Sequence, residues 1–473
     1  MKKRLVLYGG SMNPPTDAHV ATARQLHKRF DRTVVALCGL RPDKWSVNAI
    51  DPLHRAIMAR AAFRGTGVEV DFSDLDRDGF QRTIDLDRAW KERLGNDWEV
   101  WHAVGTDLIK PGDDRLSRIQ REWSEGPRVW SSLNFAVVPR PGYPIKDDDL
   151  PPHRILLPDL GYEESSSAAR EAFARGEFDR IRVPSKVKEH VRRYGLYAWA
   201  PGSRREGRLF LPPVPRLAVI PDARNPRACG YASVIKGTRA KPGNADAVVA
   251  IGGDGHMLDV IRTVHPSVPV IGINAGHRGF LLSDGGPDAF NRQVANGIPF
   301  EIQLLPLLRI DIQRPDGTWM PPRYAFNEAL ADQSGTGAAW ISFTAEGRKR
   351  RTIDRIVCDK AAVSTSAGST GHTHSMGAPI QQLHTQLLTF AAEGVCDPRQ
   401  WQNYVTVTDD SVITIECLDP RKRPICAVLD GKIVGRCVKM IIRLSRVEGV
   451  NLAFLDGHSL ADKIADFQFP SNF

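Results

Sequence analysis

The sequence lacks the marks of a secreted, membrane-spanning or zinc-stabilised protein. Its seven cysteines stand singly, with no CxxC pair and no zinc-ligand spacing, so we expect reduced thiols and a cytoplasmic location. No stretch approaches the roughly 18 apolar residues of a transmembrane helix, and no membrane partner is expected. The opening MKKRLVLYGG has a continuous apolar run of only four residues before its first glycine, which indicates a strand rather than a signal peptide.

Neither sign of charge dominates, and the basic residues do not cluster. Lys and Arg number 64 against 55 Asp and Glu, a formal net charge of +9. The densest basic run, RKRR at 348–351, is short. The excess therefore suits small molecules that carry polyphosphate, and no nucleic-acid partner is expected. A chain of 473 residues, 42% apolar and 25% charged, is typical of a soluble protein with two or three domains.

The stretch AVVAIGGDGHMLDVIR, at 247–262, carries the clearest sign of chemistry. A β-branched run ends in Gly252, Gly253, Asp254 and Gly255, and a helical pattern follows. A strand, a glycine turn and a helix in this order direct backbone N–H groups at a phosphate. A carboxylate there is unfavourable unless it holds a metal or takes a proton, so the turn suggests phosphoryl transfer to a hydroxyl. The alternative is a tight turn in which Asp254 only caps the helix.

A similar turn opens the chain. The sequence GGSMNPPTDAH, at 9–19, lies between a predicted strand at 4–8 and a predicted helix at 20–30. It places Thr16 and His19 at the helix entry, where an imidazole can donate a hydrogen bond to a phosphate oxygen. The alternative is that His19 is an ordinary residue of the first helical turn.

Strands and helices alternate through the first half. After the opening strand and helix, the patterns predict a strand, a helix and three more strands at 33–37, 53–63, 68–72, 98–104 and 135–139. This alternation predicts a parallel sheet whose ligands bind outside the carboxyl ends of the strands. The loops at 9–19, 39–45 and 105–107 would lie at that edge.

Several segments of residues 1–198 resemble, in unbroken order, the motifs of nicotinate or nicotinamide mononucleotide adenylyltransferases. They are GGSMNPPTDAH at 9–19, RTID at 82–85, VGTD at 104–107, VVPRPGY at 137–143, ESSSAAR at 164–170 and VPSKVKEHVRRYGLY at 183–197. The resemblance implies a Rossmann-like nucleotidyltransferase domain at 1–198. Its reaction would be attack of a mononucleotide phosphate on the α-phosphorus of ATP, with release of pyrophosphate.

The resemblance also implies the site residues of this half, whose work is positioning and charge neutralisation. These are His19 (catalytic) and Thr16 at the ATP phosphates, Ser166 and Arg170 at the β and γ groups, Lys44, Arg55, Thr83 and Arg140 at the mononucleotide, and Gly9, Gly10, Ser11, Gly105 and Asp107 beside them. Two departures stand out: Thr16 replaces the family's first His, and Ala18 replaces the Gly before His19. They leave open the alternative of a degenerate module that only senses nucleotide.

A stretch rich in Pro, Gly and Arg, at 199–215, predicts a linker. GGDG occurs in several kinase families, but four later segments resemble those of NAD kinases and disfavour a lipid or sugar kinase. They are GINAGHRGFL at 272–281, FNEAL at 326–330, CDKAAVSTSAGSTGHTHSMGAPI at 358–380 and AVLDGK at 427–432. The resemblance implies an NAD kinase at 216–473. Its α/β nucleotide part would comprise about 216–300 and the C-terminal segment, and alternating residues predict a β-rich, antiparallel part at about 301–455.

In this half the resemblance implies that Asp254 is the base for the adenosine 2′-hydroxyl of NAD. The amides of Gly252, Gly253 and Gly255 would hold the transferring phosphate, and Mg²⁺ or another divalent cation would neutralise charge. The other implied ligand-binding residues are Asn327 at the adenosine, Glu328 at a ribose, Asp359, Thr370 and Ser375 on the nicotinamide side, Asn274, Phe280, and His372, which replaces a stacking Tyr. His372 and His374 have no third ligand in sequence, so no protein metal site is expected.

Together the resemblances imply a fusion of two enzymes, which makes the chain a bifunctional enzyme of NAD(P) biosynthesis. Its small-molecule partners would be ATP, nicotinamide or nicotinate mononucleotide, and NAD. A homodimer or homotetramer through the kinase half is expected. Direct hand-over between the halves requires nicotinamide mononucleotide, because a nicotinate product would first need amidation, yet the motifs resemble bacterial nicotinate enzymes. The kinase donor, ATP or inorganic polyphosphate, stays open. An active kinase fused to the nucleotide-sensing module is the alternative.

Overall fold

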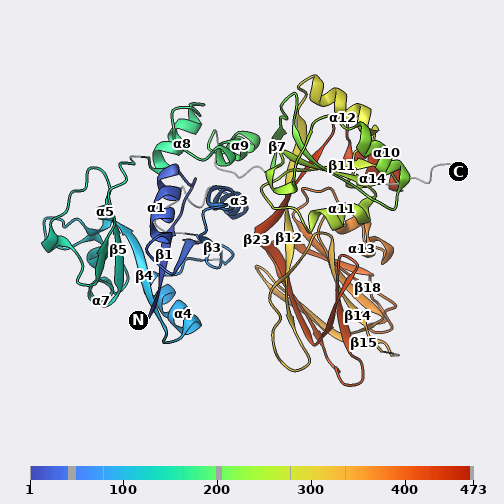
Figure 1. Cartoon of the computed structure of the whole chain (residues 1–473). Helices are drawn as coiled ribbons and strands as arrows, with labels where there is room; N and C mark the ends of the chain where they lie inside the picture. The colour runs from blue at the N-terminus through green and yellow to red at the C-terminus, as the bar shows by residue number, and fades with distance from the viewer. Residues whose placement is uncertain are drawn as a thin grey trace. The chain divides into compact units, whose positions relative to one another are not determined.

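The computed structural model describes residues 2–40, 50–77, 79–162, 164–198, 205–276, 279–335 and 337–468. The chain forms two compact units, Met1–Gly207 and Arg208–Phe473, and each is built around β-sheet (Figure 1). In the described part of the chain, no helix is both long and apolar enough to cross a membrane.

The first unit has a six-stranded sheet in the order β3-β2-β1-β4-β5-β6. Its strands are β1 (Lys3–Gly10), β2 (Arg32–Leu37), β3 (Glu69–Asp71), β4 (Trp98–Gly105), β5 (Asn134–Val138) and β6 (Arg154–Leu156). Every neighbouring pair is parallel, so the expected parallel sheet is confirmed. The strand order reverses between β1 and β4, and ligands of such sheets bind outside the carboxyl ends of the strands at this point.

Helices connect the strands of this unit. They are α1 (Asp17–His27), α3 (Pro52–Phe63), α4 (Thr83–Leu94), α5 (Thr106–Ile109), α6 (Arg118–Glu122), α7 (Gly126–Ser132), α8 (Ser166–Ala174) and α9 (Ser185–Tyr194), with a 3-10 turn at Asp147–Asp149. α3 begins at Pro52 because the fixed φ of proline suits the first helical position. The carboxylate of Asp51 accepts the Leu53 N–H there at 2.9 Å. Trp90 of α4 lies in one hydrophobic cluster with Leu5 of β1, which attaches α4 to the sheet.

The second unit contains an α/β part with parallel strands. Its elements are β8 (Arg216–Pro221), α10 (Pro226–Val234), β9 (Thr238–Arg239), a 3-10 turn (Pro242–Asn244), β10 (Ala247–Gly252), α11 (Asp254–Ile261), β11 (Val270–Asn274), α12 (Gly286–Ala295) and the C-terminal helix α14 (Leu460–Gln468). Every residue of β10 is buried, as a continuous apolar run predicts for a central parallel strand.

Two long strands extend from the α/β part into a β-rich part. β12 (Phe300–Gln313) runs antiparallel to β23 (Lys439–Phe454), with a register shift between Pro306 and Leu308, and the two lie side by side in Figure 1. The end of β23 pairs in parallel with β11, and its start pairs antiparallel with β20 (Val412–Cys417). One sheet of 11 strands therefore continues through the whole unit.

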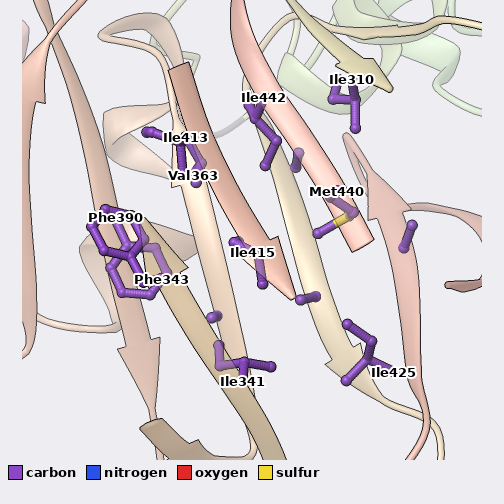
Figure 2. Packing of buried hydrophobic residues seen from close by; sticks show 14 of the residues in the cluster. Ile310, Ile341, Phe343, Val363, Phe390, Ile413, Ile415, Ile425, Met440 and Ile442 are labelled. Atoms are coloured by element: carbon purple, nitrogen blue, oxygen red, sulfur yellow. The ribbon is translucent and has the colours of Figure 1, made fainter. Parts of the chain in front are cut away.

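The β-rich part is a sandwich of this sheet and a six-stranded sheet in the order β19-β18-β17-β14-β21-β22. The remaining elements are β13 (Arg323–Ala325), β14 (Glu328–Gln333), β15 (Ala339–Glu346), β16 (Arg350–Cys358), β17 (Lys360–Ser364), a 3-10 turn (Ala367–Thr370), α13 (His372–Ser375), β18 (Leu387–Glu393), β19 (Tyr404–Thr408), β21 (Ile425–Leu429) and β22 (Lys432–Cys437). Side chains from both sheets form its core, where Phe343 of β15 stacks on Phe390 of β18 with ring centroids 4.1 Å apart (Figure 2).

The stretch 199–215 differs from the irregular linker that its composition predicts. Glu206–Leu209 forms the strand β7, and residues 199–204 lie outside the described part of the chain. Strand formation depends on pairing with a neighbour more than on local composition, so a Pro- and Gly-rich stretch does not reveal it.

The sandwich core predicts a difference between two identical truncations. Ile415 is fully buried between the sheets, whereas Ile433 on β22 is 78% exposed. We expect Ile415→Ala to lower the free energy of unfolding of this unit by about 2–5 kcal/mol, because it leaves a cavity. Ile433→Ala should change it by less than about 0.5 kcal/mol. Urea unfolding of both variants measures this, and equal midpoint shifts would contradict the described core.

Candidate functional site

The predicted phosphate loop of the first unit ends in a fixed imidazole. The backbone N–H of Thr16 donates to Nδ1 of His19 at 3.0 Å, and the Thr16 hydroxyl lies 2.7 Å from the same nitrogen. Because Nδ1 accepts the N–H, a neutral ring carries its hydrogen on Nε2. Burial and the nearby charge of Arg140 lower the pKa of His19 to about 4. At pH 7 the ring therefore offers a hydrogen-bond donor to a phosphate oxygen, but no positive charge.

Residues of α8 hold the same loop. The Ser166 hydroxyl donates to the Pro14 carbonyl at 2.9 Å, and Nη1 of Arg170 donates to the Asn13 carbonyl at 2.7 Å. The structure thus brings Ser166 and Arg170, more than 150 positions away in sequence, against the loop that carries the imidazole.

Arg55 is a buried cation at the carboxyl ends of β1 and β2. Its Nη2 donates to the carbonyls of Ser11 and Cys38, each at 2.8 Å, and burial lowers its pKa. Within the described residues, Nε and Nη1 of Arg55 have no hydrogen-bond partner. A buried guanidinium in this state is unfavourable unless an anion completes its hydrogen bonds, so the position suits a phosphate or carboxylate.

Arg140 and Asp107 meet just beyond the ends of β5 and β4. The N–H of Arg140 donates to the Thr106 hydroxyl at 2.9 Å, and its Nε lies 3.5 Å from Oδ1 of Asp107. A Cβ at Gly105 would lie 2.9 Å from that Nε. The glycine therefore permits the close approach of the guanidinium to the end of β4.

The other predicted residues of this unit have fewer contacts. Gly9 and Gly10 end β1, and a Cβ at Gly9 would meet nothing within 4 Å, so the strand end borders open space. Thr83 is the half-buried first residue of α4. Lys44 lies outside the described residues.

In the second unit, the carboxylate of Asp254 is bound by backbone amides. Its two oxygens accept the N–H groups of Phe280 and Leu281 at 3.0 and 3.1 Å. The alternative role as a helix cap is wrong, because α11 begins at Asp254 itself, and Gly253 occupies the cap position without a side-chain cap. Burial raises the pKa of Asp254, while the two amides and the charge of Lys463 lower it.

The glycine turn around Asp254 borders open space. A Cβ at Gly253 or Gly255 would meet nothing within 4 Å, so a ligand can approach the turn closely. Asn274, at the end of β11, bonds within the protein: Oδ1 accepts the Gly276 N–H at 2.9 Å, and Nδ2 donates to Asp284 at 2.8 Å. Residues 277–278 of the same motif lie outside the described part.

Asp430 organises the Asn-Glu segment, a role that the sequence did not reveal. Its carboxylate accepts the N–H groups of Phe326, Asn327 and Glu328 at 2.9, 2.8 and 3.1 Å. Asp430 and Gly431 connect β21 to β22 with φ of 43° and 75°, as expected of an Asp-Gly hairpin turn. The Asp-Gly pair was the available signal, but it predicts a turn and does not show that the carboxylate faces inward.

Asn327 and Glu328 present unsatisfied buried atoms. Within the described residues, Oδ1 of Asn327 and Oε2 of Glu328 have no hydrogen-bond partner. Burial, followed by the charge of Asp430, raises the pKa of Glu328 to about 8, so its carboxyl is mostly protonated at pH 7 and can both donate to and accept from a hydroxyl. A Cβ at Gly368 would overlap the Asn327 backbone. Only glycine lets the segment at 366–371 pack so closely.

A cavity of about 360 Å³ adjoins the segment at 358–380. Ser375 and Gly394 line it, together with Glu393 and residues that follow β18, and the carboxylate of Asp359 lies against Gly394. Thr370 is half-buried at the end of its 3-10 turn, whereas His372 is exposed at the start of α13. Asp359 and Ser375 thus both lie close to this cavity. His372, three residues before Ser375, is exposed to solvent.

The residues that the structure describes do not include a ready-made magnesium site. Across the described ranges, no group of three or more His, Cys, Asp or Glu side chains could hold a metal, and both oxygens of Asp254 already accept N–H groups. Mg²⁺ in phosphoryl transfer is often held by substrate phosphates, water and one or two carboxylates. An ion carried in by a nucleotide fits these residues better than one bound beforehand.

Glu328 predicts a pH dependence of stability. The pKa of Glu328 is about 8 in the folded chain, against an ordinary value of 4.5. Its protonated carboxyl therefore contributes to the free energy of unfolding, and this contribution is fully present below pH 4.5 and is lost as the pH rises through 8. We therefore expect the free energy of unfolding of wild type to fall by up to about a few kcal/mol relative to that of Glu328→Gln as the pH rises from 4.5 to 8. Urea unfolding across this range measures the difference. Glu393→Gln, at an exposed position, should follow wild type, and parallel curves for wild type and Glu328→Gln would contradict the raised pKa.

Two family models match the chain. Residues 219–296 match the ATP-NAD kinase N-terminal domain, and residues 7–172 match the cytidylyltransferase-like family. The chain is 32% identical over 226 residues to the NAD kinase of Cereibacter sphaeroides (strain ATCC 17029 / ATH 2.4.9), and 31% identical over 228 residues to that of Zymomonas mobilis. Each alignment covers 48% of this chain and 86% of the relative.

Solved structures with partial similarity include yeast NADH kinase complexed with NADH, at 16% identity and a TM-score of 0.42, over 50% of this chain and 71% of that one. An NAD kinase from Archaeoglobus fulgidus in complex with ATP has 21% identity and a TM-score of 0.42, and the match covers 53% of this chain and 98% of that one. The curated relatives exceed 30% identity over most of their own length. The chain therefore belongs to the NAD kinase family and carries a cytidylyltransferase-like nucleotidyltransferase domain in its first half.

Proposed function

We propose that this protein catalyses two reactions of NAD(P) biosynthesis. The second unit phosphorylates NAD at the adenosine 2′-hydroxyl to give NADP. The first unit transfers the adenylyl group of ATP to nicotinamide or nicotinate mononucleotide and releases pyrophosphate. The kinase assignment depends mainly on one observation: Met257 of α11, Phe280 and Phe326 belong to one hydrophobic cluster, which supports a site shared by the Asp254 turn and the Asn-Glu segment.

In the proposed kinase reaction, the 2′-oxygen attacks the γ-phosphorus of the donor and the bond to the leaving phosphate breaks. The hydroxyl proton passes to a carboxylate oxygen of Asp254, each of which accepts one N–H and keeps a lone pair. Asn327 and Glu328 would bind the adenosine and a ribose through their unsatisfied oxygens. Mg²⁺, when bound with the nucleotide, supplies charge neutralisation.

In the proposed adenylyl transfer, a mononucleotide phosphate oxygen attacks the α-phosphorus of ATP and pyrophosphate leaves. The nucleophile is already ionised, so the site needs positive charge and hydrogen-bond donors rather than a base. His19 would donate from Nε2, and Arg170 and Arg140 would supply charge. The two unsatisfied nitrogens of buried Arg55 are the observation that supports an anionic substrate here.

Use of nicotinamide mononucleotide, alone or beside nicotinate, would allow direct hand-over to the kinase. Incubation of each mononucleotide with ATP and Mg²⁺, followed by product analysis, tests this. NADP formed from nicotinamide mononucleotide supports both activities, and a strong preference for nicotinate contradicts hand-over. ATP binding without pyrophosphate release would favour the nucleotide-sensing alternative, and polyphosphate in place of ATP tests the kinase donor.

His19→Ala should lower kcat/KM for pyrophosphate release about 100- to 1,000-fold, the usual effect of losing one donor to transition-state charge. NADP formation from supplied NAD should stay at the wild-type level. A coupled pyrophosphate assay measures the first quantity. Pyrophosphate release at the wild-type rate would exclude His19 from the reaction.

Asp254→Asn should lower NADP formation from NAD at least about 100-fold, because the amide cannot accept the hydroxyl proton. Pyrophosphate release should be unaffected, so this variant and His19→Ala serve as controls for each other. The measurement is NADP produced from NAD and ATP. Full activity in Asp254→Asn would remove the base assignment.

A further inference from the structure

One turn of the kinase unit, residues 279–282, lies between a carboxylate and an ammonium group. Its two middle residues, Phe280 and Leu281, donate their N–H groups to Asp254 at 3.0 and 3.1 Å. From the C-terminal helix α14, Nζ of Lys463 donates to the carbonyl oxygens of the first and last residues of the turn at 2.6 and 2.5 Å. The carboxylate therefore binds the N–H groups of the turn, and the ammonium binds its carbonyl groups.

The two charges share a single peptide group. The carbonyl of Gly279 and the N–H of Phe280 belong to the same planar, trans unit, in which they point in opposite directions. Lys463 binds the oxygen end of this dipole, and Asp254 binds the hydrogen end. Hydrogen bonds in a chain polarise one another. The ammonium therefore strengthens the hydrogen bond that the Phe280 N–H donates to the Asp254 carboxylate.

Lys463 is held firmly in this position. Besides the two carbonyls it pairs with Oδ2 of Asp284 at 2.9 Å, which gives one acceptor to each of its three N–H bonds. Its side chain is only 17% exposed, so solvent screens its charge less than that of a surface lysine. The next residue, Ile464, packs against the hydrophobic cluster that contains Phe280, which anchors α14 beside the turn.

We propose that Lys463 is a positioning residue of the kinase site, which fixes the turn 279–282 and so keeps the Asp254 carboxylate oriented and ionised for the 2′-hydroxyl. The inference rests on the proposed kinase function. Without the ammonium, the carbonyl groups of Gly279 and Leu282 would lose the donor that they share, and the turn would depend on its contacts with Asp254 and with the hydrophobic core.

The charges around the turn agree with this role. Burial raises the pKa of Asp254, and the positive charge of Lys463 lowers it. Among the described residues, two other ionisable groups face Lys463. Asp284 also accepts the side-chain amide of Asn274 at 2.8 Å. His458, before α14, has its pKa lowered to about 4 by burial and by the lysine charge, so it is neutral at pH 7 and adds no positive charge beside the turn.

Lys463→Met tests the proposal, because it keeps most of the side-chain length and removes the charge. The measurement is kcat/KM for NAD, followed as NADP formation, from about pH 4.5 to 8.5. We expect the acidic limb of this profile to move up by about half to one pH unit. Lys463→Arg should return the limb toward wild type. Asp462→Asn, which changes the charge of the adjacent exposed residue, should leave it unchanged.

Three results decide the question. A Lys463→Met enzyme with altered thermal stability or KM but an unmoved limb would make Lys463 a structural contact only and overturn the proposal. If Lys463→Met does not fold, Asp284→Asn replaces it: removing this negative charge should move the limb to lower pH, and no shift overturns the proposal. If wild type forms no NADP, the proposed kinase function itself fails, whereas loss of NADP in Asp254→Asn alone leaves that function intact.

Discussion

Two carboxylates of the kinase unit, half-buried Asp254 and buried Asp430, are stabilised mainly by backbone N–H groups. Two N–H groups bind the first, and three bind the second. A charge removed from water must be hydrogen-bonded, so each carboxylate fixes the chain segment that supplies its donors. These segments, 280–281 and 326–328, border the candidate site. The geometry of the site is thus determined by where two negative charges find their donors, in addition to apolar packing.

The two carboxylates are also connected to each other through α11. Arg262, at the end of this helix, donates to the Asp430 carbonyl at 2.6 Å and to Asp259 at 2.7 Å. Lys432, beside the hairpin turn, donates to the same Asp259 at 2.7 Å. The helix that begins at Asp254 is therefore attached at its other end to the turn that carries Asp430.

Features set by neighbouring residues were predictable from the sequence, and features set by distant ones were not. The strands at 4–8 and 247–251 and the glycine turns after them follow from local apolar runs and turn chemistry, and the structure has them. The alternative in which Asp254 only caps the helix was wrong, because its oxygens bind amides 26 and 27 residues away. Asp430 and Lys463 act on residues 103 and 184 positions away, and no periodicity or spacing reports contacts at such range. The burial of Arg55 likewise depends on the order of strands in the sheet.

The long strands β12 and β23 have a mechanical consequence for the kinase unit. At about 3.3 Å per residue, the 16 residues of β23 extend over roughly 50 Å and are hydrogen-bonded to β12 for most of that length. They act as a spine common to the α/β part and the β-rich part, so two paired strands rather than a loop connect these parts. A swinging closure of these two parts around a nucleotide would have to bend this hydrogen-bonded ladder, whereas movement of a surface loop leaves the ladder intact.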